Sequence, residues 1–192
     1  MRTTFLFVFA ASLCFASAAE AQIRFLPYVG YATNQGYDFE ASPDDTAPGF
    51  LVGVGAETSL TPGLLPVGLK ARPSVETAFV SGGEVVPGTE TSTSTLRAGL
   101  DLIVDFSPPL SSFGVYAGAG VAYMSYKATA EGFDDLTGSA VGASVLAGAR
   151  FGGGFVAPFV QGRYTVGAPT PDDFSVELEN SIAVQAGASI GL

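Results

Sequence analysis

Ten ionisable side chains sit at alternate positions in segments that are otherwise apolar. In TLRAGLDLIVDF, residues 95–106, Arg97, Asp101 and Asp105 share one parity, while the other parity is apolar from Leu96 to Phe106. Because alternate side chains of a strand point to the same face, such a segment has one apolar face and one ionic face. The same parity in other segments collects a predicted network of Arg24, Glu57, Lys70, Arg72, Glu76, Arg97, Asp101, Asp105, Arg150 and Arg163, with Gln161 and Gln185 as neutral partners. We expect these charges to pair, since an unpaired buried charge is strongly destabilising.

The residues needed for catalysis are scarce. The chain has no His, which removes the usual general base for a Ser nucleophile. Its one cysteine is Cys14, near the N-terminus, so a thiolate metal site and a disulfide framework are excluded for the rest of the chain. The glycines at 118–120 and 152–154 are interpreted as strand and turn residues and not as phosphate loops. We therefore expect neither enzymatic activity nor a cofactor.

Three pairs of adjacent aspartates are the remaining candidates for ligand chemistry. They are Asp44-Asp45, Asp134-Asp135 and Asp172-Asp173. Clustered carboxylate oxygens suit a divalent cation, so a calcium or magnesium site shared with lipid phosphates is one interpretation. The other is that these pairs belong to solvated acidic loops. The spacing matches no EF-hand loop, so we predict no defined metal site.

The N-terminus has the pattern of a secretory signal peptide. Arg2 precedes an apolar run over residues 5–18, and Ala19-Glu20-Ala21 is a small-x-small cleavage motif. We expect residues 1–21 to be removed, leaving residues 22–192 as one domain. A lipid anchor on Cys14 is the alternative, but Leu13 stands where that signal needs a small residue.

Eight segments with the two-residue period position the charged side chains. They cover residues 23–32, 50–60, 67–79, 95–106, 113–125, 140–151, 155–166 and 182–192. The spacers alternate between long (33–49, 80–94, 126–139, 167–181) and short (61–66, 107–112, 152–154). In an up-and-down meander, this order places every long loop at one end and every short turn at the other. Outer-membrane barrels are built in this way.

Composition favours a chain that spans a membrane with strands. Hydrophobic residues make up 47% of the chain and charged residues only 14%, where a soluble domain carries about 25%. No apolar run after the N-terminus reaches the roughly 18 residues of a membrane helix. Eleven strand residues tilted by about 40° span roughly 25 Å, the height of the apolar band of such a barrel. We predict an all-β fold, an eight-stranded antiparallel up-and-down transmembrane β-barrel, with a bulge or register break at Pro73.

Outward aromatic residues are sorted by strand end. Tyr31, Phe50, Phe79, Tyr123 and Tyr164 fall near the long spacers, and Phe25, Phe106, Phe113 and Phe151 near the short ones. Two girdles of amphipathic rings are expected at the two membrane interfaces.

The charge outside the predicted lumen is strongly negative. Thirteen acids and Lys127 lie in the long spacers, which gives −12, while the six bases and four acids inside give +2. Together they equal the net charge of −10. An acidic rim disfavours nucleic acid and other anionic partners.

These features together resemble the small eight-stranded outer-membrane barrels of the outer membrane protein A/X kind. The resemblance covers residues 22–192 and is one of pattern, not of a signature motif. It implies a bacterial outer-membrane location, outer-membrane lipids as partners, a monomer, and a role in anchoring the envelope, in surface contacts or in passing very small solutes. Many such proteins end in an aromatic residue that the insertion machinery reads, whereas this chain ends in Leu192.

Three functional hypotheses follow from the sequence. The first is a non-enzymatic envelope or surface protein whose polar lumen is filled by side chains. The second is a narrow pore for small solutes, gated by the ion pairs of the lumen. The third is a soluble lipocalin-like carrier of an apolar ligand, which requires an apolar interior and a polar exterior.

Overall fold

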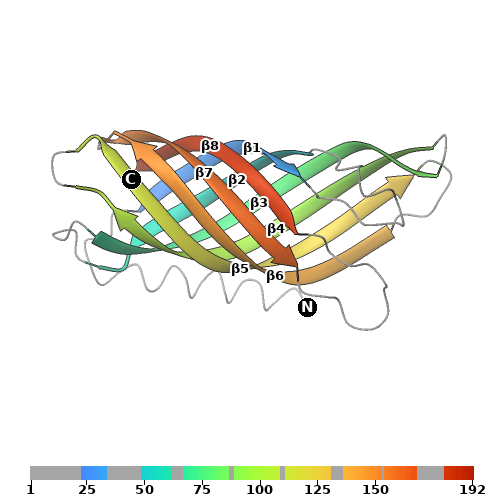
Figure 1. Cartoon of the computed structure of the whole chain (residues 1–192), viewed down its shortest axis with the longest axis horizontal. Helices are drawn as coiled ribbons and strands as arrows, with labels where there is room; N and C mark the ends of the chain where they lie inside the picture. Colours follow the sequence, from blue (N-terminus) through green and yellow to red (C-terminus); the bar gives the residue numbers. More distant parts are fainter. Residues whose placement is uncertain are drawn as a thin grey trace.

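Eight antiparallel strands close into a single barrel in which each strand pairs with its neighbours in the sequence and β1 pairs with β8 (Figure 1). The computed structural model describes residues 23–33, 49–61, 67–86, 89–108, 111–130, 136–152, 154–167 and 180–192. The strands are β1 (Arg24–Thr33), β2 (Gly49–Ser59), β3 (Val67–Val86), β4 (Thr89–Phe106), β5 (Phe113–Ala130), β6 (Leu136–Phe151), β7 (Val156–Gly167) and β8 (Ser181–Gly191). This architecture confirms the predicted fold. Residues 1–22 lie outside the described residues, so the signal peptide stays a prediction.

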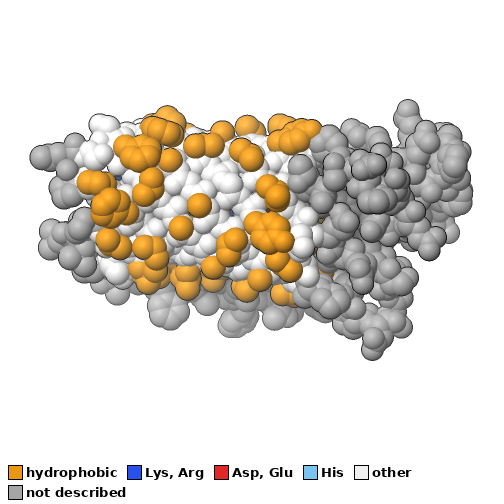
Figure 2. All heavy atoms as spheres, viewed as in Figure 1, with side chains coloured by type: hydrophobic (Ala, Val, Ile, Leu, Met, Phe, Trp, Pro, Cys, Tyr) orange, Lys and Arg blue, Asp and Glu red, His pale blue; other side chains and the backbone are white. Residues whose placement is uncertain are grey.

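Burial alternates along each strand with the predicted parity. In β4, Leu100 is 50% exposed while Asp101 beside it is fully buried. In β8, Val184 is 58% exposed and Gln185 is fully buried. Figure 2 shows hydrophobic side chains spread over the outside of the described barrel, with almost no charged side chain among them. The apolar row therefore faces outward and the ionic row faces the lumen, which contradicts the lipocalin-like hypothesis because that carrier needs the opposite orientation.

Aromatic side chains predicted to form the girdles lie on the outside of the barrel. Tyr31 on β1, Phe50 on β2 and Phe79 on β3 are consecutive partners in the strand register, so their rings form one row. At the other end, Phe113 and Phe151 are paired across β5 and β6, with ring centroids 5.5 Å apart. The remaining predicted members are also exposed: Phe25, Phe106, Tyr123 and Tyr164. Their contact with membrane interfaces remains a prediction.

Two spacers predicted to be long loops are largely strand. β3 continues to Val86 and β4 begins at Thr89, within the predicted loop 80–94. β5 continues to Ala130 and β6 begins at Leu136, within the predicted loop 126–139. The prediction was wrong here because Ser and Thr continue the hydrogen-bonded ladder after the apolar alternation ends. Figure 1 shows β3–β6 running on past the other four strands at this end of the barrel, which we call the loop end.

Among the described residues, the two outer strands of the extension are paired on one side only. Pairing of β2 with β3 ends at Gly49 and Val80, and pairing of β6 with β7 ends at Gly142 and Gly167. The register between β3 and β4 shifts twice in the extension, between Ser81 and Gly83 and between Glu84 and Val86.

Pro73 does not produce the predicted bulge. It pairs with Leu100 on β4 without a shift of register. On the β2 side, Ser74 pairs with Gly55 and Ala71 with Thr58, so the same register holds above and below the proline. Only the two positions between them are missing from that ladder. The absent N–H of proline interrupts the pairing, but no extra residue is inserted.

A charged residue on the outer face should be most destabilising halfway along the barrel. Leu100→Arg places a cation in the middle of the apolar row. It is expected to lower the free energy of unfolding in vesicles by about 2–4 kcal/mol. Leu60→Arg is the matched control, because Leu60 lies just beyond β2 at the end of the barrel with the short turns. This change should lower the free energy of unfolding by only about 0–1 kcal/mol. Urea titration of the folded protein in lipid vesicles measures both. Equal effects would contradict an apolar exterior immersed in hydrocarbon.

Candidate functional site: the ionic lumen

All ten predicted network residues point into the lumen. Eight of them are buried, and Arg24 and Lys70 are of intermediate exposure. They come from six of the eight strands, because β5 and β8 contribute none of these charges. An eight-stranded barrel is just wide enough for its interior to fill with side chains. Charges from opposite walls can therefore meet.

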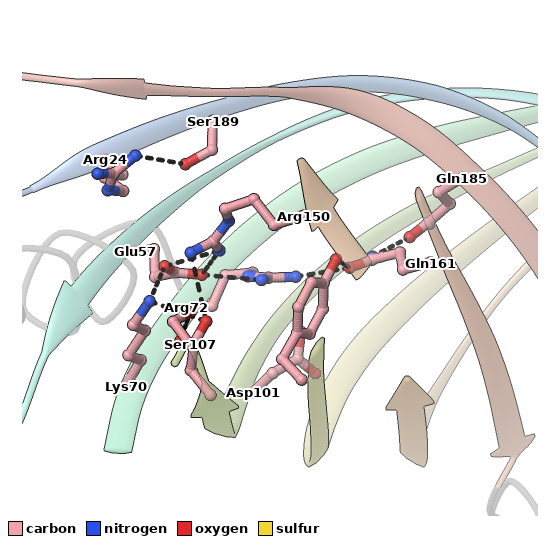
Figure 3. Close-up of polar contacts among 12 residues, drawn as sticks. Arg24, Glu57, Lys70, Arg72, Asp101, Ser107, Arg150, Gln161, Gln185 and Ser189 are labelled. Atoms are coloured by element: carbon pink, nitrogen blue, oxygen red, sulfur yellow. Dashed lines mark hydrogen bonds and ion pairs between the residues drawn. The ribbon is translucent and has the colours of Figure 1, made fainter. Parts of the chain in front are cut away.

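Five of these residues form a cluster near the short turns, which we call the turn-end cluster. Glu57 lies at its centre, since its carboxylate accepts from Arg72 at 2.8 Å and from Arg150 at 2.9 Å, and pairs with Lys70 at 3.0 Å. Figure 3 shows these cations converging on Glu57. Asp105 is the second acid, 3.0 Å from the Lys70 amine and 3.3 Å from Arg150. Three cations thus share two carboxylates, which leaves this cluster with one excess positive charge.

A second cluster lies farther toward the loop end, and we call it the mid-barrel cluster. Arg163 binds Asp101 through both terminal nitrogens, at 3.0 and 2.9 Å, which is a bidentate pair. Arg97 lies 3.6 Å from Glu76 and 3.8 Å from Asp101. Arg97 and Arg163 also both donate to the Ser144 hydroxyl at 3.2 Å. Two cations and two acids make this cluster electrically neutral.

Two glutamines join the clusters. Gln161 accepts from Arg72 at 2.6 Å and donates to Gln185, which in turn donates to Glu76 at 2.9 Å. A continuous path of hydrogen bonds and ion pairs therefore runs from Glu57 to Asp101, through the two amides, Glu76 and Arg97. Figure 3 shows its first part, from Glu57 to Gln185. Arg24 is the predicted member that the structure does not bring into this path. Arg24 instead donates a long hydrogen bond, 3.5 Å, to the Ser189 hydroxyl.

Tyr28 and Tyr116 belong to the network, although the sequence analysis did not single them out. The Tyr28 hydroxyl donates to Glu76 at 2.9 Å, and the Tyr116 hydroxyl donates to Gln161 at 2.9 Å. The guanidinium carbons of Arg72 and Arg150 lie 4.9 and 5.6 Å from the centre of the Tyr116 ring, within range for cation–π attraction. Both tyrosines occupy inward positions in the two-residue period of segments 23–32 and 113–125. This period is the signal in the sequence that could have identified them.

Each of these tyrosine rings covers a glycine on the neighbouring strand. Tyr28 pairs with Gly53, and Tyr116 pairs with Gly148. A Cβ added at Gly53 would meet the Tyr28 ring at 2.5 Å, and one at Gly148 would meet the Tyr116 ring at 2.6 Å. The missing side chain therefore lets the ring lie flat across the barrel wall and reach its polar partner.

The arrangement places ion pairs across the lumen. The carboxylates of both clusters are engaged by cations, and no nucleophile stands beside a free base among the described residues. No group of three or more potential metal ligands occurs in that part of the chain either. The aspartate pairs at 44–45, 134–135 and 172–173 lie outside the described residues. In the described ranges, no helix is long and apolar enough to cross a membrane.

Comparison with known proteins finds a matching family and solved structures with the same fold. The family model described as outer membrane protein beta-barrel domain matches residues 6–187. A search of curated protein sequences found no match. Among solved structures, Neisserial surface protein A has 18% identity and a TM-score of 0.63, over 91% of this chain and 100% of that one.

Two further solved structures share the fold at lower similarity. Ail of Yersinia pestis, in complex with the heparin analogue sucrose octasulfate, has 11% identity and a TM-score of 0.54, over 91% of this chain and 100% of that one. The outer membrane enzyme PagL has 14% identity and a TM-score of 0.51, over 88% of this chain and 99% of that one. At these identities the likeness extends to the fold alone.

Removing the central acid should destabilise the barrel more than removing an ion pair. Glu57→Gln leaves three cations with Asp105 as their only acid in the cluster. It is expected to lower the free energy of unfolding by about 3–5 kcal/mol, since it breaks a buried pair. Glu57→Gln combined with Lys70→Met restores the original excess charge and should recover part of that loss. Urea titration in vesicles measures both variants. A double variant less stable than Glu57→Gln would contradict charge balance as the cause.

The close approach of Tyr116 to Gly148 gives a second test. In Gly148→Ala the added Cβ would meet both the Tyr116 ring and the Val160 carbonyl oxygen at 2.6 Å. The variant is therefore expected to lower the free energy of unfolding by about 1–3 kcal/mol, the cost of overpacking. Gly162→Ala on β7 is the control, because an added Cβ there meets nothing within 4 Å. Equal stability of the two variants would show that the ring position does not depend on the glycine.

Proposed function

The chain belongs to the outer membrane protein beta-barrel domain family, and from this premise we propose that it is a non-enzymatic surface protein of the bacterial outer membrane with a closed lumen. In this role the barrel is a membrane anchor, and the acidic segments at its loop end meet the surroundings. The single observation that carries the proposal is the continuous network from Glu57 to Asp101, which fills the lumen with paired side chains.

Sequence and site chemistry support the non-enzymatic part. The fold does not decide the question, because the enzyme PagL shares it with surface proteins. The chain contains no His at all, and the four lumen carboxylates are paired with Arg or Lys. A Ser nucleophile would therefore lack its usual activating base.

The charge outside the lumen limits the partners that this surface suits. Ail was solved with a sulfated, polyanionic heparin analogue. Here, thirteen acids lie in the segments 33–49, 80–94, 126–139 and 167–181. Repulsion of like charges disfavours a polyanion, so we propose neutral or cationic partners for this end of the barrel.

Conductance distinguishes the closed barrel from the narrow pore. The purified protein inserted in a planar bilayer should show no steady single-channel conductance, because the lumen is occupied by the two charge clusters. Heat-modifiable gel migration of the same sample reports that the barrel is folded. A steady wild-type conductance that is lost in Arg97→Gln would overturn the closed lumen and favour the pore. A protein that stays soluble without detergent would overturn the membrane assignment.

A further inference from the structure

Arg24 is the inward cation that the ion pairs near the short turns leave over. It is the register partner of Glu57 on β2, but that carboxylate is already shared by the three cations of the turn-end cluster. The Arg24 guanidinium instead donates to the Ser189 hydroxyl, and Figure 3 shows this contact set apart from the cluster. Among the described residues it has no carboxylate partner. The side chain is partly exposed, so its other N–H donors are open to solvent.

The charges at this end of the lumen are out of balance by two. Arg24 adds to the excess charge of the turn-end cluster, so four cations face two carboxylates. The short turns cannot supply the missing acids, because none of them contains an ionisable side chain. These turns are residues 61–66, 107–112 and 152–154. An anion from outside the chain can therefore complete the balance.

The chain termini do not change this count. The terminal carboxylate of Leu192 lies at this end, because the Leu192 N–H donates to the Ile23 carbonyl at 3.0 Å. Removal of the predicted signal peptide creates an amino group at Gln22, directly before Ile23. These two terminal charges offset each other. In the part of the chain that the structure describes, no ion pair joins Arg24 to the Leu192 carboxylate.

Lys70 is the second accessible cation, and it lies two strands from Arg24. Its side chain is 13% exposed, and its two ion pairs use two of the three donors of the ammonium group. Two strand spacings are roughly 10 Å, so these long inward side chains can reach one small ligand between them. Inward hydroxyls lie at the same end. We call this group the turn-end mouth and define it as Arg24, Ser59, Lys70, Ser107 and Ser189.

We propose that the turn-end mouth binds a water-soluble phosphate group, as inorganic phosphate or as a phosphate monoester. Such a group carries a charge of about −1.5 to −2 at pH 7, which matches the excess of two positive charges. Its oxygens accept hydrogen bonds from guanidinium, ammonium and hydroxyl groups. Because these side chains face the lumen and not the lipid, the ligand reaches them from water. This water is the periplasm in the proposed membrane location, on which the inference rests.

The acidic loop end does not oppose binding at the turn-end mouth. The thirteen acids of the long segments lie toward the other end of the barrel, across an apolar band about 25 Å high. Solvent-exposed charges farther apart than about 8 Å are largely screened at physiological ionic strength. The two ends of the barrel therefore suit ligands of opposite charge.

Titration of the intact barrel with phosphate tests this inference. The folded protein is placed in phosphatidylcholine nanodiscs, which leave both ends open to the buffer. Isothermal titration calorimetry measures the binding of inorganic phosphate and of acetate, at one ionic strength set with sodium chloride. We expect one phosphate per barrel, bound at least about tenfold more tightly than acetate, because phosphate accepts at least one more charge-assisted hydrogen bond.

A second nanodisc preparation separates the two possible sources of a phosphate group. It contains phosphatidylglycerol, whose phosphodiester could compete for the same cations. Phosphate affinity equal to that in phosphatidylcholine is expected, since lipid contacts the outer face of the barrel. Loss of phosphate binding in phosphatidylglycerol would overturn the assignment to a water-soluble ligand.

Two variants and one control assign the binding to the turn-end mouth. Arg24→Gln should weaken phosphate binding at least about tenfold, the loss of one charge-assisted hydrogen bond. Arg24→Lys keeps the charge and should retain part of the affinity. Lys127→Gln removes the same charge from an exposed position on β5 at the loop end and should leave binding unchanged. Heat-modifiable gel migration reports that each variant is a folded barrel.

The outcomes separate this inference from the proposed function. A wild type that folds in nanodiscs but binds phosphate no better than acetate would overturn the phosphate site and leave the surface-barrel function standing. Equal weakening by Arg24→Gln and Lys127→Gln would also overturn the site, because net charge would then be the cause. A chain that does not enter membranes would overturn both.

Discussion

The narrowness of the eight-stranded lumen is the constraint on which the rest of this structure depends. The interior of such a barrel holds side chains, so its inward charged groups pair with one another inside the lumen. Glu57 meets this constraint by accepting from Lys70, Arg72 and Arg150, and Asp101 meets it with the two nitrogens of Arg163. Glycines at the wall are part of the same solution, because they let tyrosine rings lie flat and turn their hydroxyls toward Glu76 and Gln161.

The outer surface has the same two-residue period as the lumen, but its side chains are of a different kind. Every second side chain faces outward, and these side chains are mostly apolar, although Thr58 and Thr77 share the outward parity. On β5 the outward residues beyond Tyr123 are Ser125, Lys127 and Thr129, where the sheet of β3–β6 continues. The kind of outward residue therefore changes along this strand, while its ladders with β4 and β6 continue without a register shift.

Parity was sufficient to predict the fold and the inward direction of the ten lumen charges. Arg97 and Asp101 were assigned to the lumen because an unbroken apolar row lies between them, and the structure buries both. Partners within the lumen were not predictable, because the contact of Arg72 with Gln161 joins residues 89 positions apart and depends on the register of every strand between them. Tyr28 and Tyr116 escaped notice because tyrosine suits an interface girdle as well as a lumen. The ends of β3–β6 were missed because Ser and Thr alternate without apolar contrast.

The unequal strand lengths have a consequence for how one molecule meets another. A closed barrel has no open edge, but beyond Val80 no residue of the described ranges pairs with β3 on the β2 side. Such an edge is a template for sheet growth between chains. The two register shifts in this stretch bend the strand and break the even spacing of its donors and acceptors. Bulges of this kind make an edge strand a poor template for the strand of another chain.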